Sequence, residues 1–192
     1  MKQYNVGVIG ATGMVGQRFV TLLEHHPWFR LTVVAASARS AGKTYEEAVG
    51  SRWLMQTPMP ENARKLIVQD AAQVEKIAAQ VDFVFCAVNM KKEEIKALEE
   101  AYAKAECPVV SNNSAHRFTP DVPMVVPEIN ADHIEIIPAQ RKRLGTPARF
   151  YRRQVQLQPA ELCTRAASPA RVRHHRRAGL HLPGYFGRRE NF

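Results

Sequence analysis

The sequence predicts an α/β fold with a doubly wound, mostly parallel sheet, and three observations support this. Short apolar or β-branched runs typical of buried strands alternate with stretches of helical spacing. The first such run, Tyr4–Ile9, ends at a glycine-rich turn that leads into an amphipathic stretch. Strands separated by helical stretches favour right-handed crossovers, and these generate a parallel sheet.

Each further element is expected from its local pattern. Four more segments are expected to be strands because they are short and apolar: Leu31–Ala36, Val81–Val88, Pro108–Ser111 and Met124–Val126. Two amphipathic segments are expected to be helices: Met14–Glu24 and Lys91–Lys104.

The composition changes abruptly near Thr146. The chain has 192 residues and a formal net charge of +9. Residues 147–192 contribute +8 of that charge, with ten Arg, two Glu and neither Lys nor Asp, which leaves +1 for residues 1–146. All eight Ile and all nine Lys lie in residues 1–146. We therefore expect a folded domain over residues 1–146 and an irregular, disordered basic tail over residues 147–192.

Length, hydropathy and cysteine content limit the function classes. The chain is long enough for one domain with a core, but short for a two-domain enzyme. No apolar run reaches membrane-spanning length, and the first residues lack the layout of a secretory signal. Three cysteines at unrelated spacings indicate neither a disulfide framework nor a zinc site. We expect a cytoplasmic protein without a metal or a membrane partner. A nucleic-acid partner is not expected, because the positive charge lies outside the body.

Three glycines follow the first predicted strand with the spacing Gly-x-x-Gly-x-x-Gly: Gly10, Gly13 and Gly16. Small residues here let the backbone turn tightly and approach a pyrophosphate, and the following helix supplies free N–H groups and a partial positive charge. A glycine triplet also serves as a purely structural turn. Its position between an apolar strand and a helix favours a dinucleotide site, and therefore a Rossmann-like domain.

The segment after the second predicted strand indicates which dinucleotide is bound. Enzymes that use NAD usually carry an acid there, which binds the ribose 2′-hydroxyl. This chain has Ser37-Ala-Arg-Ser-Ala-Gly-Lys43, without an acid. Arg39 and the hydroxyl of Ser40 suit a 2′-phosphate, which a carboxylate would repel. The alternative is an ordinary solvated loop, but together with the glycine loop the segment predicts NADP.

Three blocks of the sequence resemble the aspartate-semialdehyde dehydrogenase family. They are Gly10-Ala-Thr-Gly-Met-Val-Gly16, the Ser37–Lys43 segment, and Ser111-Asn-Asn-Ser-Ala-His-Arg-Phe118 followed by Pro120-Asp-Val-Pro-Met-Val-Val-Pro-Glu-Ile-Asn130. The last block is the most specific, because generic nucleotide-binding folds do not require it. The resemblance covers residues 4–146.

The resemblance implies an NADP-dependent enzyme that interconverts L-aspartate 4-semialdehyde plus phosphate with 4-aspartyl phosphate, in lysine, threonine and methionine biosynthesis. In that family a cysteine attacks the aldehyde, hydride passes to NADP, and phosphate releases the acyl group. Arg117 and Asn113 would bind the substrate phosphate. A planar guanidinium such as that of Arg117 can bind a phosphoryl group in bidentate fashion, and the alternative is an ordinary surface arginine. By motif match, the cofactor-binding residues would be Gly10, Thr12, Gly13, Met14, Val15, Ser37, Arg39 and Ser40.

The nucleophile and the base of that reaction are not expected in this chain. A catalytic cysteine needs a depressed pKa and a nearby base. Cys86 lies inside an apolar strand and Cys107 precedes a strand, so both are expected to be structural, while Cys163 lies in the tail. Three lone histidines are expected at ordinary positions on a helix surface or in a loop: His25, His26 and His116.

The codons of the tail offer an explanation for its composition. If Gln156-Leu157-Gln158 is encoded by CAA-CTG-CAG before a proline codon, reading one base later gives AAC-TGC-AGC, or Asn-Cys-Ser. This resembles the nucleophile motif of the family. We therefore hypothesise one extra base, or a two-base loss, near the codon for Thr146, which would remove the catalytic and dimerisation domain of a homo-oligomeric enzyme. A genuine basic tail is the alternative.

Two other functions fit parts of the sequence. An N-acetyl-glutamyl-phosphate reductase has a similar loop and acyl-phosphate chemistry, although the Ser111–Phe118 block favours the first family. A different class is a non-catalytic NADP-binding module whose basic tail binds nucleic acid, for which salt-dependent DNA binding would be diagnostic.

Overall fold

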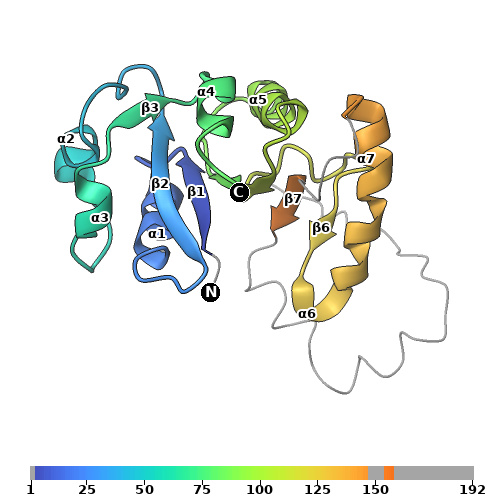
Figure 1. Cartoon of the computed structure of the whole chain (residues 1–192), viewed down its shortest axis with the longest axis horizontal. Helices are drawn as coiled ribbons and strands as arrows, with labels where there is room; N and C mark the ends of the chain where they lie inside the picture. The colour runs from blue at the N-terminus through green and yellow to red at the C-terminus, as the bar shows by residue number, and fades with distance from the viewer. Residues whose placement is uncertain (1–2, 147–153, 158–192) are drawn as a thin grey trace, which may run out of the picture. The chain divides into compact units, whose positions relative to one another are not determined.

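The computed structural model describes residues 3–146 and the backbone of residues 154–157. Within these residues, seven strands form one sheet in the order β3-β2-β1-β4-β5-β7-β6, and every strand pairs in parallel with its neighbours (Figure 1). The strands are β1 (Tyr4–Ile9), β2 (Phe29–Ala36), β3 (Val68–Asp70), β4 (Phe83–Cys86), β5 (Val109–Ser111), β6 (Met124–Val125) and β7 (Gln154–Leu157). The strand order reverses direction between β1 and β4, which confirms the doubly wound parallel sheet expected from the sequence.

Helices connect most of the strands. They are α1 (Met14–Leu22), α2 (Tyr45–Val49), α3 (Glu61–Arg64), α4 (Val74–Ala78), α5 (Lys92–Lys104), α6 (Pro127–Asn130) and α7 (Ile137–Leu144). Short 3-10 helices follow α2 and α6, at Gly50–Arg52 and Ala131–Ile136. Figure 1 shows α2 and α3 beside β3 and α7 beside β6, so short helices lie near both edges of the sheet.

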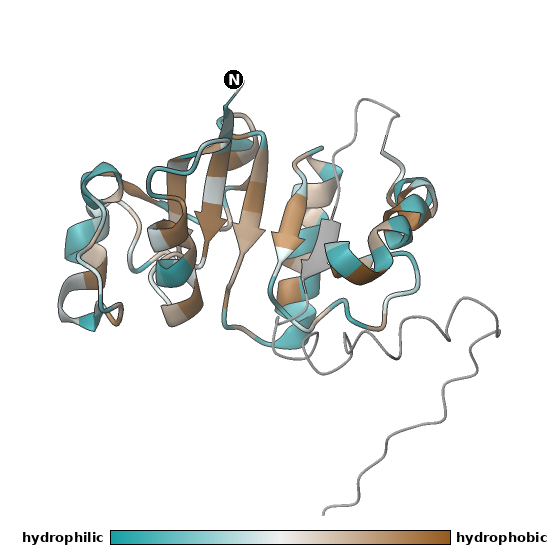
Figure 2. Cartoon of the chain, turned by 90° about the horizontal axis from the view of Figure 1, so that it is seen from below, coloured by the Kyte–Doolittle hydropathy of each residue, from teal (hydrophilic) through white to brown (hydrophobic). Residues whose placement is uncertain are grey.

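The apolar core lies on both faces of the sheet. Successive side chains of a strand point to opposite faces, and in β2 Val34 packs in one cluster while Val33 and Ala35 pack in the other. The first cluster includes residues of α1, α2 and α3, and the second includes residues of α4 and α5. Figure 2 shows the strands as mainly hydrophobic and the helices as mixed, as is typical of parallel strands covered on both sides.

The predicted elements are found, with shifted ends. The first helix ends at Leu22 rather than Glu24, because His25 has a left-handed φ of 55°, which a continuing α-helix does not allow. The strand expected over Val81–Val88 spans only Phe83–Cys86. The sequence analysis missed β3 and the short helices α2, α3, α4, α6 and α7, since elements of three to eight residues are too short to show a clear period.

The sheet also includes part of the segment that was expected to be irregular. The strand β7 lies between β5 and β6, and its Gln156 is in register with both Ser111 and Met124. Its sequence, Gln-Val-Gln-Leu, alternates polar and apolar residues, a pattern typical of strands. The structure therefore differs from the expectation at these four residues. The rest of the expected tail lies outside the described residues.

Candidate functional site

A cleft of about 500 Å³ lies at the carboxyl ends of the central strands. Its walls include Gly10 after β1, Ser37 after β2, Asp70 at the end of β3 and Ala87 after β4. In open α/β sheets, ligands bind outside the carboxyl ends of the strands, where the strand order reverses. The cleft therefore lies where this topology favours a ligand.

The three loop glycines are required for different reasons. Gly10 has a φ of +84°, and a Cβ there would lie 2.5 Å from the carbonyl oxygen of Ala87 on β4's loop. A Cβ on Gly16 would overlap the carbonyl oxygen of Gly10. A Cβ on Gly13 would meet only the Gly10 oxygen, at an ordinary contact distance of 3.5 Å. The fold thus requires glycine at 10 and 16, whereas at position 13 it leaves room for a Cβ.

Two buried side chains hold the glycine loop from behind. The hydroxyl of Tyr45 donates to the Ala11 carbonyl at 2.8 Å, and the amide nitrogen of Gln17 donates to the Thr12 carbonyl at 3.1 Å. Both side chains are almost fully buried. The sequence analysis missed both residues, because their partners belong to a loop and not to a periodic pattern. These bonds hold the carbonyls of Ala11 and Thr12 in fixed directions and so restrain the backbone of the loop.

The structure brings some of the predicted cofactor residues to the cleft and not others. Gly10, Thr12, Gly13, Ser37 and Arg39 line it. Met14 and Val15 do not, and the Met14 side chain is 61% exposed. Their amides belong to the first turn of α1, where N–H groups have no intrahelical acceptor, so these residues suit backbone contacts to a pyrophosphate. Ser40 is also absent from the lining; its amide donates to the Ser37 carbonyl at 2.9 Å, in the turn that carries Arg39.

A carboxylate that the sequence analysis missed shares the cleft with Arg39. Asp70 is the last residue of β3, and its Oδ1 accepts the amide of Ala72 at 3.0 Å. The second strand is indeed followed by no acid, but the third strand contributes one to the same cleft. Asp70 was not predicted at a strand end because β3, with only three residues, is too short to show a strand pattern in the sequence. Arg39 and Asp70 therefore bring side chains of opposite charge to the lining of the same cleft.

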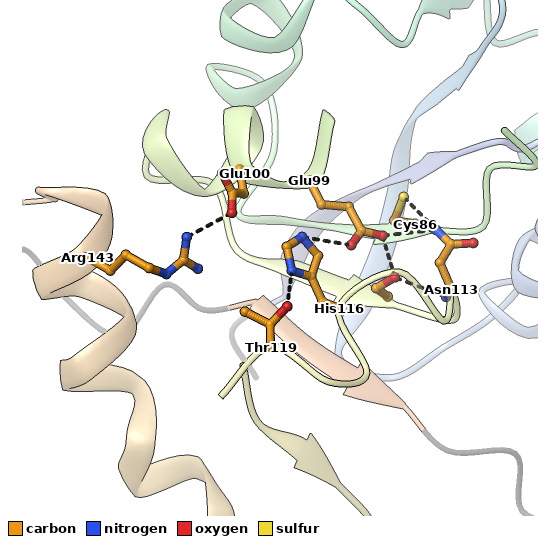
Figure 3. Close-up of polar contacts among 8 residues, drawn as sticks. Cys86, Glu99, Glu100, Asn113, His116, Thr119 and Arg143 are labelled. Atoms are coloured by element: carbon orange, nitrogen blue, oxygen red, sulfur yellow. Dashed lines mark hydrogen bonds and ion pairs between the residues drawn. The ribbon is translucent and has the colours of Figure 1, made fainter. Parts of the chain in front are cut away.

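A second polar cluster lies beside the cleft and includes side chains of residues 111–119, a segment that starts at the last residue of β5 and is called the 111–119 loop below (Figure 3). At its centre is Glu99 of α5, whose Oε1 accepts a hydrogen bond from the Ser111 hydroxyl at 2.5 Å and one from the Asn113 amide at 2.9 Å. The His116 Nε2 faces the other carboxylate oxygen at 3.9 Å, too far for a hydrogen bond but within range of an ion pair when His116 is protonated. The amide of Asn113 also contacts the Cys86 sulfur at 3.4 Å.

Arg117 lies in this loop with an exposed side chain. Its backbone N–H donates to the Ser114 carbonyl at 3.3 Å, and the next residue, Phe118, is 93% exposed. Asn113, expected beside the phosphate, uses its amide nitrogen within the cluster around Glu99. The loop starts at the cleft. The backbone N–H of Asn112 donates to the Cys86 carbonyl at 3.0 Å, and the residues that follow Cys86 line the cleft.

Glu99 was not predicted as a functional residue from the sequence, although a signal was present. The buried residues of α5 are Ile95, Glu99 and Tyr102, which have the i, i+4, i+7 spacing of a single helix face. A glutamate on the apolar stripe of an amphipathic helix indicates a buried charge with dedicated partners. Its sequence neighbour Glu100 belongs to a different contact, a 2.8 Å ion pair with Arg143 of α7 (Figure 3).

The described cysteines are both buried, as the sequence led us to expect. Burial, together with the nearby charge of Glu99, raises the pKa of the Cys86 thiol, so this sulfur stays protonated and is a poor nucleophile. Cys107 has no exposed surface. Cys163 lies outside the described residues.

The three lone histidines have less ordinary surroundings than expected. His116 lies in a loop, which was one of the two positions expected for the histidines. It is nevertheless only 1% exposed, and it packs against Glu99. His25 and His26 lie in the turn after α1, not on its surface, and the His26 ring stacks on Phe29 at a centroid distance of 4.5 Å.

In the part of the chain that the structure describes, no group of His, Cys, Asp and Glu is arranged to hold a metal, and no helix is long and apolar enough to cross a membrane.

Comparisons with known proteins agree with this site. A family model described as the NAD-binding domain of semialdehyde dehydrogenase matches residues 5–137. An aspartate-semialdehyde dehydrogenase of Archaeoglobus fulgidus is 41% identical over 145 residues, which cover 74% of this chain and 40% of that protein. The enzyme of Aspergillus fumigatus is 42% identical over 144 residues, covering 75% of this chain and 38% of that protein.

A solved structure agrees as well. The crystal structure of aspartate-semialdehyde dehydrogenase with NADP from Candida albicans matches with a TM-score of 0.74 and 30% identity, and covers 91% of this chain and 48% of that one. This chain spans about two fifths of the length of the curated relatives named above. Both the sequence match and the cleft fall in the nucleotide-binding half, and the chain therefore belongs to the semialdehyde dehydrogenase family, of which it carries the NAD-binding domain.

Proposed function

We propose that this chain is the NADP-binding part of an aspartate-semialdehyde dehydrogenase, a cytoplasmic enzyme of lysine, threonine and methionine biosynthesis. One observation carries the proposal. The cleft that begins at the glycine loop ends at β4, and the loop that presents Arg117 is hydrogen-bonded to the same strand end through Cys86. Two features suited to phosphate groups therefore share one edge of the sheet, as a reaction between a dinucleotide and an acyl phosphate requires.

Each residue has a physical role in this proposal. The amides at the start of α1 bind the pyrophosphate, and the open face of Gly13 lets it approach. Arg39 binds the 2′-phosphate and Arg117 binds inorganic phosphate or the acyl phosphate, both as charge-assisted contacts. NADP, when bound, accepts or supplies the hydride. The substrates would be L-aspartate 4-semialdehyde and phosphate in one direction and 4-aspartyl phosphate in the other.

The position of β7 supports the proposed change of reading frame. With the codons assumed above for Gln156-Leu157-Gln158, the shifted frame would place Asn-Cys-Ser at residues 156–158. Gln156 is in register with Ser111, the first residue of the loop that carries Arg117, and Leu157, where the shifted frame has cysteine, is the next residue along β7. A cysteine there would lie at the carboxyl edge of the sheet, beside the phosphate loop. We therefore propose that residues 147–192 are read out of frame, and that these residues do not supply the nucleophile.

A comparison of two genes tests the proposal. The unrepaired chain and a gene repaired near codon 146 and extended downstream are assayed for phosphate-dependent reduction of NADP by the semialdehyde. We expect NADP binding by both proteins in calorimetry, and turnover by the repaired protein alone. Turnover by the unrepaired chain would refute the change of frame, and an inactive repaired protein would show that the recovered Asn-Cys-Ser is a coincidence. Failure of either protein to bind NADP would refute the cofactor site itself.

A further inference from the structure

Glu99 is a buried carboxylate to which the proposed reaction assigns no role. The residue is 0% exposed, although its neighbour on α5, Leu98, lines the cofactor cleft. A charged carboxylate is costly to remove from water unless hydrogen-bond donors surround it. A generic apolar residue would fill this position on the buried stripe of α5 without that cost. The contacts of Glu99 must therefore account for its presence.

Three contacts of Glu99 are with side chains of one loop. Ser111 and Asn113 donate to Oε1 of Glu99 at 2.5 and 2.9 Å, and His116 faces Oε2 at 3.9 Å. The other ring nitrogen of His116, Nδ1, lies 3.1 Å from the Thr119 hydroxyl, which extends the network to the end of the loop (Figure 3). A single carboxylate thus accepts hydrogen bonds from two residues of the loop, Ser111 and Asn113, and faces a third, His116, which contacts Thr119.

The network leaves Arg117 pointing outward. Ala115 and His116 are buried, whereas Arg117 and Phe118 are exposed. Because His116 is fixed on one side of Arg117 and Thr119 on the other, the backbone at residue 117 has little freedom to turn. The Arg117 guanidinium is therefore presented from a backbone held in place by Glu99.

We propose that Glu99 is a positioning residue, which holds the 111–119 loop so that Arg117 is ordered before its phosphate group binds. This inference rests on the proposed role of Arg117 and adds a residue from α5 that does not touch the phosphate. Ordering the loop in advance strengthens binding, since the entropy loss is not incurred when phosphate arrives. The same helix lines the cofactor cleft through Leu98, so α5 would set the relative placement of the two sites.

The test measures inorganic phosphate and NADP binding separately in the full chain. Phosphate is titrated while the Arg117 Nε–H resonance is followed by NMR, and NADP affinity is measured by calorimetry. We expect Glu99→Ala to weaken phosphate binding about fivefold, the scale of losing the pre-ordering of one long side chain, without changing NADP affinity. Glu99→Gln should keep most of the wild-type phosphate affinity, because the carbonyl oxygen of glutamine can still accept hydrogen bonds from Ser111 and Asn113. The matched control is Glu100→Gln, which alters the neighbouring carboxylate and should bind phosphate like the wild-type chain.

A second variant covers the case in which Glu99→Ala fails to fold. Thr119→Val keeps the shape of a half-buried side chain and removes only the hydroxyl beside His116, and it should weaken phosphate binding in the same direction. Wild-type phosphate affinity in Thr119→Val and in any folded Glu99→Ala would overturn the positioning role. Phosphate binding that is absent, or unchanged by Arg117→Ala, would instead refute the phosphate role of Arg117, on which the inference depends.

Discussion

Replacing Gly13 with alanine should separate ligand binding from folding. Gly13 has φ −80° and ψ 164°, an extended conformation that alanine adopts without strain. The added Cβ would have a single neighbour within 4 Å, the Gly10 oxygen at 3.5 Å. The substitution therefore fits the folded chain, and its main effect is to place a methyl group where the backbone faces the cleft.

The expected magnitudes follow from this geometry. Restricting the unfolded chain stabilises the protein by about 0.4–1 kcal/mol, whereas alanine is a poorer N-cap than glycine by a similar amount. The free energy of unfolding should thus change by less than about 1 kcal/mol. Keeping a pyrophosphate from one charge-assisted hydrogen bond costs about 1.5–3 kcal/mol. NADP affinity should therefore fall about 10- to 150-fold.

Gly16→Ala is the matched comparison, three residues further along the chain in the first turn of α1. Its Cβ would overlap the Gly10 carbonyl oxygen and lie 2.7 Å from the Ala11 Cα, both backbone atoms that cannot rotate away. We expect a loss of more than about 2 kcal/mol of stability in urea unfolding, typical of severe overpacking. Calorimetry with NADP on folded Gly13→Ala completes the experiment. Wild-type NADP affinity in Gly13→Ala, or a stability loss as large as that of Gly16→Ala, would refute the reasoning.

Three further predictions concern other parts of the chain. Arg39→Ala should lower NADP affinity about tenfold or more and leave NAD affinity nearly unchanged, as measured by calorimetry with both dinucleotides; an equal loss for both would contradict the role of Arg39. Arg143 pairs with two carboxylates at 2.5 and 2.8 Å but is 38% exposed, so Arg143→Ala should cost about 1 kcal/mol in urea unfolding, and less in high salt. Burial and the charge of Glu99 raise the pKa of Cys86, so its thiol stays neutral in the folded chain while the unfolded chain releases the proton above about pH 8.5. Stability should fall as the pH rises beyond that value, with a smaller slope in Cys86→Ala; an equal slope in both proteins would contradict this assignment.

Local patterns were sufficient for the central part of the fold. The apolar runs at β1, β2 and β4 and the amphipathic helix α5 are long enough for their hydrophobic period to be read directly. The glycine loop was predictable for a similar reason, since backbone conformation and close approach act within seven residues, from Gly10 to Gly16. A buried parallel sheet with a ligand cleft at its carboxyl edge follows from these elements and the preferred handedness of their connections.

The short elements and the polar partners were decided by the tertiary structure. The strand β3 has only three residues and gains its conformation from pairing with β2, so neither the strand nor the placement of Asp70 beside Arg39 could be read from a local period. β7 likewise depends on β5 and β6, which flank it.

Glu99 shows most clearly what could and could not be predicted from the sequence. Its spacing from Ile95 and Tyr102 puts it on the buried face of α5, and this much is written in the sequence. Its partners lie in a loop that begins twelve residues later at Ser111, and they reach the carboxylate only after α5 packs beside β5. The position of a residue on a helix face determines whether its charge is buried. The hydrogen bonds that stabilise the buried charge come from distant segments, which only the folded sheet brings together.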